Sequence, residues 1–523
     1  MSEHDYFSPT AEGLTVGVVG AGVMGRGIAQ LFAEAGVTVL LADASADAVS
    51  AARDFCAGMI ERKVAKGKLD AAAAEAAAGR IRTTDAGPEH GYAAFADCDL
   101  VIEAVVERMD IKHAVLAGVE QAVSAQCIIA SNTSSLSVTG FAAAAERPGR
   151  IAGLHFFNPV PLMRLVEVIG GERTDAAALD ALAGLVERTG HHPVRAADTP
   201  GFLVNHAGRG YTTEALRIVS EGICAPADID RVMTDAAGFR MGPFTLLDLT
   251  GLDVSHKVME SIYTQYYNEP RHRPVPLVGR RVTAGLLGRK TGEGFYRYVD
   301  GKQQWPDEVP APSLPAKLPP VWISAEVPEW RVRLAAIFSA AGANVESAAR
   351  PSRDALIVVT PLGADATTAA LGANLDAHRT VAVDCLLGLD ARRTLMATPV
   401  TGSDRLAAAH ALLGADGTPV TAIEDSPGFI AQRIIAAIVN VGADIAQQRI
   451  AAPADIDQGV RLGLGYPRGS LEFGDSLGPW RVLAILDAMH AFYGDPRYRA
   501  SPWLRRRALL GAALSDTRGS GAA

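Results

Sequence analysis

The segment Thr15-Val-Gly-Val-Val-Gly-Ala-Gly-Val-Met-Gly25 decides the fold of the N-terminal part of the chain. Its first half, Thr15–Val19, is a short β-branched run typical of a buried strand. Its second half opens the alanine-rich stretch Gly22–Ala35, which we expect to be a helix. Val23 and Met24 lie between the last two glycines. A strand, a glycine turn and a helix in this order predict a dinucleotide-binding loop.

The glycines and the acidic residue that follows them indicate which dinucleotide binds. Gly20 permits the tight turn, Gly22 lets a pyrophosphate approach the backbone, and Gly25 allows close packing of helix on strand. Asp43 ends the second expected strand, where a carboxylate suits the ribose hydroxyls and repels a 2′-phosphate. Because Ala44-Ser-Ala46 supplies no arginine for such a phosphate, the sequence favours NAD over NADP. The alternative is a glycine turn that only tightens packing.

Strands and helices alternate from the N-terminus to about Pro200 and predict a mostly parallel sheet with helices on both faces. The further strands that we expect are Thr38–Leu41, Leu100–Glu103, Ile128–Ser131 and Ile151–Phe156, with helices at Ala46–Val64 and Ile111–Val123. From Pro200 to about Leu287 the sequence predicts helices only. Prolines are dense in residues 301–320, which we interpret as an interdomain linker. Strands resume at Val321–Ser324, Ala355–Thr360 and Thr380–Asp384.

Composition excludes several classes of protein. At 523 residues the chain is too long for one core, so several domains are expected. A net charge of −9 gives no basic surface for nucleic acid. No apolar run reaches the roughly 20 residues that span a membrane, and Met1-Ser-Glu-His-Asp-Tyr6 does not resemble a signal peptide. Five cysteines far apart argue against disulfides or a zinc cluster. We therefore expect a cytoplasmic protein without a bound metal.

An internal repeat shows that part of the chain occurs twice. Asp198-Thr-Pro-Gly-Phe recurs as Asp425-Ser-Pro-Gly-Phe, and Ala225-Pro-Ala-Asp-Ile-Asp230 recurs as Ala452-Pro-Ala-Asp-Ile-Asp457. The offset along the chain is the same from Asp198 to Asp425 as from Ala225 to Ala452, so no gap intervenes. Several matches at one offset predict a helical domain in two copies, each preceded by an α/β domain.

The two copies differ at the positions that matter for chemistry. The second α/β segment has no glycine fingerprint, Gln432 stands opposite Asn205, and the segment Met396-Ala-Thr-Pro399 contains no histidine. We therefore predict an α/β Rossmann-type domain plus an all-α domain, duplicated with a degenerate second half. The expected divisions are 1–197, 198–300, the linker 301–320, 321–424, 425–515 and a tail, 516–523.

Three further motifs carry a resemblance to a known family. They are Ser131-Asn-Thr-Ser-Ser135, His155-Phe-Phe-Asn-Pro159 with Glu167 downstream, and Asp198-Thr-Pro-Gly-Phe-Leu-Val-Asn205. Together they resemble the L-3-hydroxyacyl-CoA dehydrogenases, over residues 14–298 and, through the repeat, to about residue 510. The resemblance implies NAD-dependent oxidation of an (S)-3-hydroxyacyl-CoA to the 3-oxoacyl-CoA.

The resemblance assigns catalysis to four residues whose chemistry suits the reaction. His155 can accept the hydroxyl proton near neutral pH, and Glu167 would orient the imidazole, as carboxylates do in serine hydrolases. Ser134 and Asn205 can hydrogen-bond the C3 oxygen or the thioester carbonyl, with Asn158 as a supporting contact. The alternative for His155, taken alone, is a hydrogen-bonded core histidine.

Other residues follow from the resemblance. Asn132, Glu107 and Lys112 match positions near the cofactor, and solvated surface charges are the alternative for Glu107 and Lys112. The stretch Met59–Lys68 corresponds to a helical hairpin that embraces coenzyme A, and of its lysines (Lys63, Lys66 and Lys68) we select Lys66. An exposed helix face is the alternative. His191 and His192 lie outside the motifs and are expected to face solvent.

The acyl group is a separate question. The two-copy layout and Gly238-Phe-Arg-Met-Gly-Pro-Phe244 resemble the 3-hydroxyadipyl-CoA dehydrogenases of phenylacetate catabolism. We expect Arg240 to recognise a distal carboxylate, and a structural ion pair is the alternative. Other substrates that stay open are 3-hydroxybutyryl-CoA, general β-oxidation intermediates and a free hydroxy acid. A catalytically idle NAD-binding protein is a further alternative. The second helical copy is expected to form an internal pseudo-dimer, and the sequence leaves open whether whole chains also form homodimers.

Overall fold

The computed structural model of the chain describes residues 6–517, which form two compact units. The first unit contains the residues up to His206 together with Gln448–Leu464. The second contains Ala207–Gln447 together with the residues from Gly465 on. Most of the expected tail, 516–523, lies outside the described residues. Within the described part, no helix has the length and apolar character that a membrane crossing requires.

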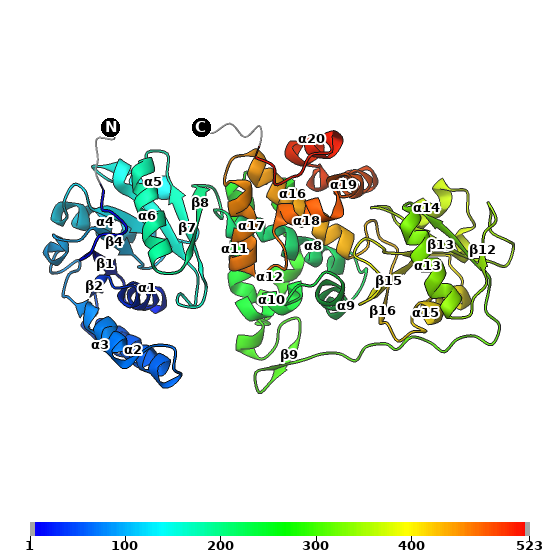
Figure 1. Ribbon diagram of the computed structural model, residues 1–523, viewed down its shortest axis with the longest axis horizontal. Coiled ribbons are helices and arrows are strands. Elements are labelled where there is room, and N and C mark those ends of the chain that lie inside the picture. Colours follow the sequence, from blue (N-terminus) through cyan, green and yellow to red (C-terminus); the bar gives the residue numbers. More distant parts are fainter. Residues whose placement is uncertain (1–5, 518–523) are drawn as a thin grey trace. The chain divides into compact units, whose positions relative to one another are not determined.

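An eight-stranded sheet organises the first unit (Figure 1), in the order β3-β2-β1-β4-β5-β6-β7-β8. Every neighbouring pair is parallel except β6 and β7. The strands are β1 (Thr15–Val19), β2 (Thr38–Ala42), β3 (Ile81–Thr83), β4 (Leu100–Glu103), β5 (Ile128–Ser131), β6 (Ile151–Phe156), β7 (Leu165–Gly170) and β8 (His192–Ala197). The mostly parallel sheet predicted from the sequence is confirmed.

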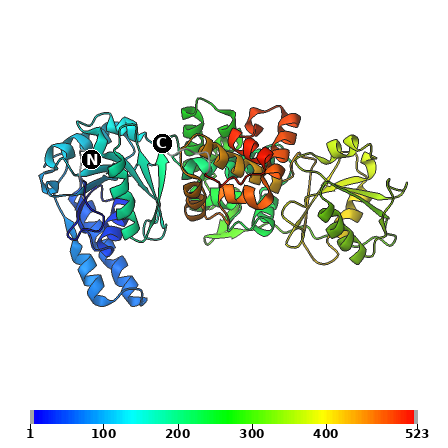
Figure 2. The ribbon, with the colours of Figure 1, turned by 45° about the horizontal axis from the view of Figure 1, so that its top comes forward.

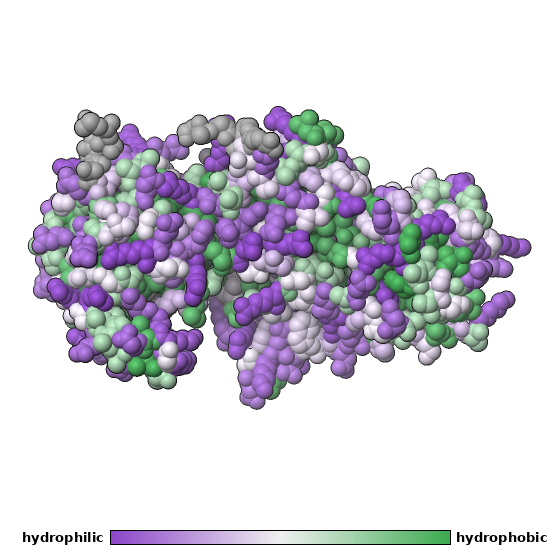
Figure 3. Space-filling view, viewed as in Figure 1, coloured by the Kyte–Doolittle hydropathy of each residue, from purple (hydrophilic) through white to green (hydrophobic). Residues whose placement is uncertain are grey.

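Helices cover both faces of this sheet and form two apolar cores. One core lies between the sheet and helices α1 and α6, and the other between the sheet and α4 and α5. The helices are α1 (Val23–Glu34), α2 (Ala46–Ala65), α3 (Ala71–Arg80), α4 (Met109–Ala122), α5 (Val138–Ala142) and α6 (Ala176–Arg188). Helices α2 and α3 form a hairpin that projects from the sheet (Figure 2). Apolar residues show on its surface in Figure 3, in keeping with the alanine-rich α3.

The expected strands and helices agree closely with the structure at their ends. One expectation about histidines is wrong. His191 is buried, and its Nε2 lies 2.9 Å from the carbonyl oxygen of Val160, whereas His192 is exposed as expected. The reason is long-range, because Val160 lies 31 residues earlier in the chain.

The second unit contains most of the helices and a second sheet. The helices that follow the first sheet are α7 (Val204–Ala207, which begins in the first unit), α8 (Arg209–Ser220), α9 (Pro226–Arg231), the π-helix η3 (Val232–Ala236), α10 (Pro243–Thr250), α11 (Leu252–Gln265) and α12 (Pro276–Thr283). Strands β9 (Arg297–Val299) and β10 (Lys302–Gln304) then pair in a small hairpin. The expected linker therefore begins with a strand, and only residues 305–320 lack regular structure.

The second sheet has six strands in the order β12-β11-β13-β14-β15-β16. They are β11 (Val321–Ala325), β12 (Val345–Glu346), β13 (Leu356–Thr360), β14 (Thr380–Val383), β15 (Arg393–Ala397) and β16 (Val420–Ile423), with helices α13 (Pro328–Ala340), α14 (Ala366–Gly372) and α15 (Ser403–Leu413). The antiparallel pair β14–β15 occupies the place of β6–β7 in the first sheet. The remaining helices are α16 (Ala431–Gln447), α17 (Pro453–Leu464), α18 (Ser470–Leu477), α19 (Pro479–Tyr493) and α20 (Pro502–Leu510).

The repeat is visible in the backbone. Phe202 and Phe429, which are counterparts in the repeat, both have a positive φ, of 47° and 50°. The aspartates that precede them also act alike. Asp198 accepts hydrogen bonds at the start of α5, from the amide of Val138 at 2.9 Å, and Asp425 accepts them at the start of α14, from Ala366 at 2.8 Å. Both copies therefore use one turn and one helix cap.

The offset of the repeat shows how the second copy differs. It places Ala382 of β14 opposite His155 and Thr394 of β15 opposite Glu167. Met396 lies in β15, the counterpart of β7, so the segment Met396–Pro399 is not the counterpart of the His155 segment. The expectation that the second copy has no histidine at this position is nevertheless confirmed, because the offset places Ala382 there.

Gln432 occupies the position in the second copy that Asn205 has in the first. The Oε1 of Gln432 accepts from the Gly363 amide at 2.8 Å. Its Nε2 donates to the carbonyl of Pro361 at 3.1 Å and to Asp384 at 3.0 Å. Pro361 is the counterpart of Ser134. The polar groups of the second copy thus satisfy one another, in a half that lacks the histidine and the glutamate.

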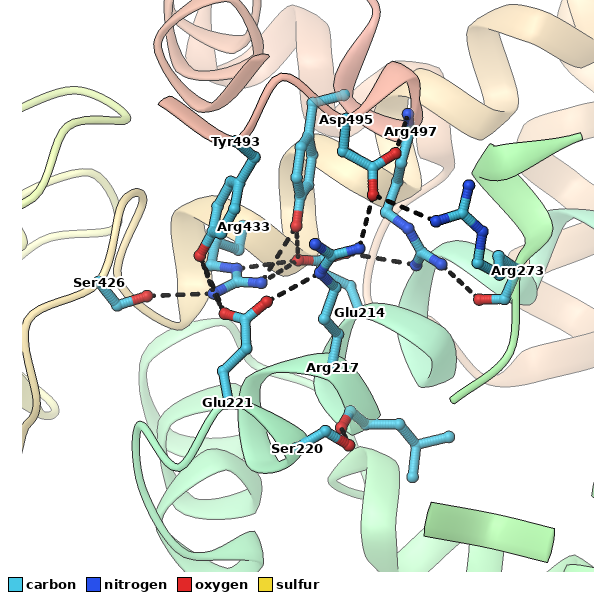
Figure 4. Close-up of polar contacts among 12 residues, drawn as sticks. Glu214, Arg217, Ser220, Glu221, Arg273, Ser426, Arg433, Tyr493, Asp495 and Arg497 are labelled. Carbon is cyan, nitrogen blue, oxygen red and sulfur yellow. Dashed lines mark hydrogen bonds and ion pairs between the residues drawn. The ribbon is translucent and has the colours of Figure 1, made fainter. Parts of the chain in front are cut away.

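The two helical copies meet through α8 and α16. A Cβ on Gly210 would lie 2.9 Å from the carbonyl carbon of Ala437, its own counterpart in the repeat. A buried ion-pair network lies near this contact between Gly210 and Ala437 (Figure 4). Arg433 of α16 is fully buried, and its guanidinium donates to Glu214 of α8 at 2.8 Å and to Glu221 at 2.8 Å. Because buried charges are tolerated only when paired, this network joins the two copies.

We expect Arg433→Met to lower the free energy of unfolding by about 3–5 kcal/mol, because it removes the closer of the two cations beside the buried Glu214 and leaves only Arg497, at 3.7 Å. The control is Arg333→Met, which removes an exposed pair with Asp390 and should cost about 0–1 kcal/mol. Thermal melting of both variants measures the difference. Equal melting temperatures would show that the network does not hold the copies together.

Candidate active site

The glycine loop has the shape that a pyrophosphate requires. Gly20 has a φ of +104°, and a Cβ there would lie 2.6 Å from the carbonyl oxygen of Ala104. A Cβ on Gly25 would lie 1.7 Å from the carbonyl oxygen of Gly20, so only glycine allows the helix this close. Gly22 differs, since no atom lies within 4 Å of its Cβ position. No side chain caps α1 at Gly22, so the backbone N–H groups at its start face this open space.

Asp43 follows β2 beside the loop. Its carboxylate accepts from the amide of Ala21 at 2.7 Å and from that of Ser45 at 3.0 Å. The same side chain lines a cavity of about 300 Å³. Arg53 and His90 line this cavity too, although the sequence analysis did not single them out. They come from α2 and from the loop after β3, and no local pattern connects them to the glycine loop.

Glu107 holds the loop that contains Ser134. One of its carboxylate oxygens accepts from the hydroxyl of Thr133 at 2.7 Å and from the amides of Ser134 at 3.0 Å and Ser135 at 3.1 Å. Burial acts to raise the pKa of the Glu107 carboxyl, but these hydrogen bonds and the charge of Lys112 outweigh it and lower the pKa below its usual range. The carboxylate is therefore kept ionised at the base of the loop.

Lys112 lies beneath Glu107 and is not a surface charge. Its side chain is 1% exposed, and Nζ lies 2.8 Å from Glu103 and 3.3 Å from Glu107. Ser131 also donates to Glu103. The alternative of a solvated lysine, which was left open from the sequence, is therefore wrong. Glu107 itself is partly accessible, with 36% of its side chain exposed.

His155 and Glu167 face each other on neighbouring strands. They form a register pair in the antiparallel ladder of β6 and β7, and the His155 Nδ1 lies 2.6 Å from the Glu167 Oε2. The glutamate side chain is completely buried and the histidine is 7% exposed. The rings of Phe157 and Phe202 lie 4.5 and 6.1 Å from the imidazole. The ladder and these rings fix the imidazole in one orientation.

The second oxygen of Glu167 binds the segment that leads to Asn205. Its Oε1 accepts from the amides of Leu203 at 2.9 Å and Val204 at 2.8 Å. One carboxylate therefore fixes His155 and the residues directly before Asn205. These two amides could not be predicted from the sequence, where the only signal for them is the repeated Pro-Gly-Phe motif.

Of the remaining predicted residues, one lies among the site residues already described and the others are exposed. Asn132 is the first of these, and its Oδ1 accepts from the amide of Phe156 at 2.9 Å, which joins the ends of β5 and β6. Asn158 is exposed in the loop that follows β6. Lys66 is exposed at the outer end of α2, away from the sheet, while Lys63 pairs with Glu34. Arg240 is exposed in the second unit.

A glycine loop beside an acidic residue, with a buried histidine–glutamate pair at the carboxyl edge of the same sheet, defines a nicotinamide-dependent dehydrogenase. Residues 15–199 match the family model described as "3-hydroxyacyl-CoA dehydrogenase, NAD binding domain". Residues 201–298 and 428–521 both match "3-hydroxyacyl-CoA dehydrogenase, C-terminal domain", which confirms the repeat. The chain belongs to the 3-hydroxyacyl-CoA dehydrogenase family, and its cofactor is NAD.

Named relatives match either nearly the whole chain or its first half. It is 36% identical over 505 residues to the 3-hydroxyadipyl-CoA dehydrogenase of Escherichia coli K12, covering 95% of this chain and 98% of that one. The crystal structure of 3-hydroxybutyryl-CoA dehydrogenase from the same organism matches with a TM-score of 0.81 at 34% identity, covering 96% and 99%. A probable 3-hydroxybutyryl-CoA dehydrogenase of Deinococcus radiodurans is 42% identical and covers 54% of this chain and 99% of its own length. These names differ in the acyl group.

We expect Gly22→Ala to fold normally, because its methyl group meets no protein atom. The methyl group would occupy the approach of the pyrophosphate and raise the Kd for NAD by about tenfold or more. Gly25→Ala should also lose thermal stability, since its methyl group collides with the Gly20 carbonyl. Fluorescence titration with NADH and thermal melting measure both effects. Unchanged NAD binding by Gly22→Ala would contradict this assignment of the loop.

Proposed function

We propose that the first half of the chain oxidises an (S)-3-hydroxyacyl-CoA with His155 as the base and Glu167 as its partner. The buried contact of 2.6 Å between the two side chains carries this proposal. A carboxylate on Nδ1 leaves Nε2 to accept a proton and stabilises the imidazolium that forms. Ser134 and Asn205 are the proposed partners of the substrate oxygens.

The proposed reaction follows from these residues. Bound NAD supplies the nicotinamide that accepts the hydride from C3 of the substrate. His155 removes the proton of the C3 hydroxyl as the carbon–oxygen double bond forms, so the alcohol loses two electrons and two hydrogens. Ser134 and Asn205 orient C3. Burial of the imidazole beside Phe157 and Phe202 keeps water from the transferred proton.

The cofactor and coenzyme A contacts are proposals as well. The backbone from Gly20 to Gly25, including Val23 and Met24, suits the pyrophosphate, and Asp43 suits the adenosine ribose. Glu107 and Asn132 lie at the edge where the nicotinamide end would lie. Lys112 is buried beneath Glu107, so we assign it an indirect role. Lys66, exposed at the outer end of the hairpin, is the proposed contact for a coenzyme A phosphate.

For the acyl group we propose 3-hydroxyadipyl-CoA. The full-length relative of that name and the two-copy layout support this substrate. Arg240 is exposed and, within the part of the chain that the structure describes, makes no ion pair, so its guanidinium is available to a ligand carboxylate. The second candidate is 3-hydroxybutyryl-CoA, favoured by the name of the matching crystal structure.

The substrate test compares kcat/KM for the two acyl-CoAs by NADH absorbance at about 340 nm. We expect a preference of about tenfold or more for the adipyl substrate. Arg240→Ala should reduce that preference by about 10- to 150-fold, since a charged hydrogen bond contributes about 1.5–3 kcal/mol. Activity on the butyryl substrate is the internal control. An unchanged preference in Arg240→Ala would exclude this residue as the carboxylate partner.

The test of the base is His155→Ala. Turnover should fall by about 100- to 10,000-fold, the usual contribution of general base catalysis. The Kd for NAD should stay close to that of the unmodified protein, because the glycine loop does not include His155. Loss of NAD binding and thermal stability together would mean that His155 serves folding instead.

Two further proposals concern the domain divisions and the association of the two helical copies. The domain divisions at residues 197, 300 and 424 are supported by the matched ranges 15–199, 201–298 and 428–521, and those at 320 and 515 stay predictions. The contact of α8 with α16 supports an internal pseudo-dimer of the helical copies. A cytoplasmic location and homodimers of whole chains stay predictions.

A further inference from the structure

Helix α17 belongs to the second helical copy in sequence but packs in the first unit, against β7 and β8. The chain just before it is tied to the sheet, because the Ala197 amide at the end of β8 donates to the carbonyl of Ile450 at 2.8 Å. Asp455 in the first turn of α17 accepts from the Arg195 amide at 3.4 Å. The helix therefore completes the fold around the candidate active site.

Two glycines lie where α17 contacts Leu203 and Val204. Gly459 and Gly463 are one helical turn apart, so they lie on one side of the helix. A Cβ on Gly463 would lie 2.8 Å from the Leu165 Cδ2 and 3.0 Å from the Val204 Cγ1. A Cβ on Gly459 would lie 3.0 Å from the Leu203 Cδ2. The two glycines let the helix backbone approach Leu203 and Val204 at van der Waals distance.

These two residues lead directly to the reacting groups. Leu203 and Val204 are buried, and their amides donate to the carboxylate of Glu167 at 2.9 and 2.8 Å. The other oxygen of Glu167 contacts His155, and Asn205 is the next residue in the chain. Pressure on the side chain of Val204 would thus move an amide that fixes Glu167 and the backbone that carries Asn205.

The equivalent contact in the second half lacks this feature. The Glu424 amide donates to the carbonyl of Ile223 at 3.1 Å, which repeats the pair Ala197–Ile450 with the two copies exchanged. At the offset of the repeat, Val232 and Ala236 occupy the positions of Gly459 and Gly463. Of the two copies, therefore, only the one whose helix packs against Leu203 and Val204 has these glycines, and the copy with Val232 and Ala236 does not.

We propose that α17 is a positioning element for the active half, and that Gly459 and Gly463 set the place of the segment Phe202–Asn205. The proposal rests on the roles of His155 and Asn205 in the proposed function. It gives the second half a task in catalysis, although that half has no glycine loop and has Ala382 and Thr394 at the positions of His155 and Glu167. Gly459 and Gly463 are positioning residues, since they act through Leu203 and Val204.

The experiment is Gly463→Ala in the full chain. The added methyl group would meet the Leu165 Cδ2 at 2.8 Å and the Val204 Cγ1 at 3.0 Å. The displacement of Val204 should lower kcat roughly 10- to 100-fold, since small misplacements of reacting groups cost this much. The KM for NAD should not change. Alanine also favours a helix, so the melting temperature should stay within a few degrees of the original. The matched control is Gly372→Ala in α14, whose methyl group meets no atom and should leave kcat unchanged.

Two further measurements separate positioning from stability. Val204→Ala combined with Gly463→Ala removes the 3.0 Å contact with Val204 and keeps the one with Leu165, so it should restore the part of kcat that the displacement of Val204 costs. The pH dependence of kcat/KM should shift in Gly463→Ala, because the amide of Val204 no longer holds Glu167, the partner of His155, in place. It should not shift in Gly372→Ala. If Gly463→Ala does not fold, Gly459→Ala, with its milder contact, provides the same test.

An unchanged kcat and pH profile in Gly463→Ala would overturn the proposal, and so would a loss of kcat that Val204→Ala fails to restore. Failure of the proposed function gives a different result. In that case His155→Ala keeps its turnover, whatever happens at α17. If His155→Ala is inactive and Gly463→Ala is fully active, the proposed function holds and only the role of α17 is wrong.

Discussion

The carboxylate of Glu167 is the constraint on which the active half depends. It is completely buried, and a buried carboxylate is tolerated only when hydrogen bonds compensate for the lost water. Both oxygens are used, one by His155 and the other by the amides of Leu203 and Val204. Two strands and the turn into the helical region are therefore held in one arrangement. The imidazole and the segment before Asn205 cannot move independently.

A duplicated chain can lose chemistry in one copy while keeping the structure that both copies share. Asp425 caps its helix as Asp198 does, and Phe429 repeats the backbone turn of Phe202. Where the active copy has Asn205, the second copy has Gln432, whose amide is fully hydrogen-bonded to its neighbours. Buried polar groups of this kind are stable only as a closed set. The degenerate half is therefore packed as a structural domain, and its helix α17 is available to support the other half.

Much of the fold could be predicted because its signals are local. Strand β1 and the glycines after it are adjacent in sequence, and Gly25 is required by a backbone contact within the loop itself, with Gly20. The strand ends agreed closely, since β-branched runs bounded by turns are read from short windows. The burial of Lys112 and His191 could not be predicted, because it depends on partners brought close by the sheet.

The sequence by itself determined the family, the cofactor and the positions of His155, Glu167, Ser134 and Asn205, because those residues lie in short motifs whose spacing is set along one chain. Only the tertiary structure decided how each atom is used. It divided the two oxygens of Glu167 between a side chain and a backbone turn, and it brought α17 to Leu203 and Val204 from a distant part of the sequence. The physical reason is that packing and hydrogen bonding act between neighbours in space, and the chain order does not specify which distant segments become neighbours.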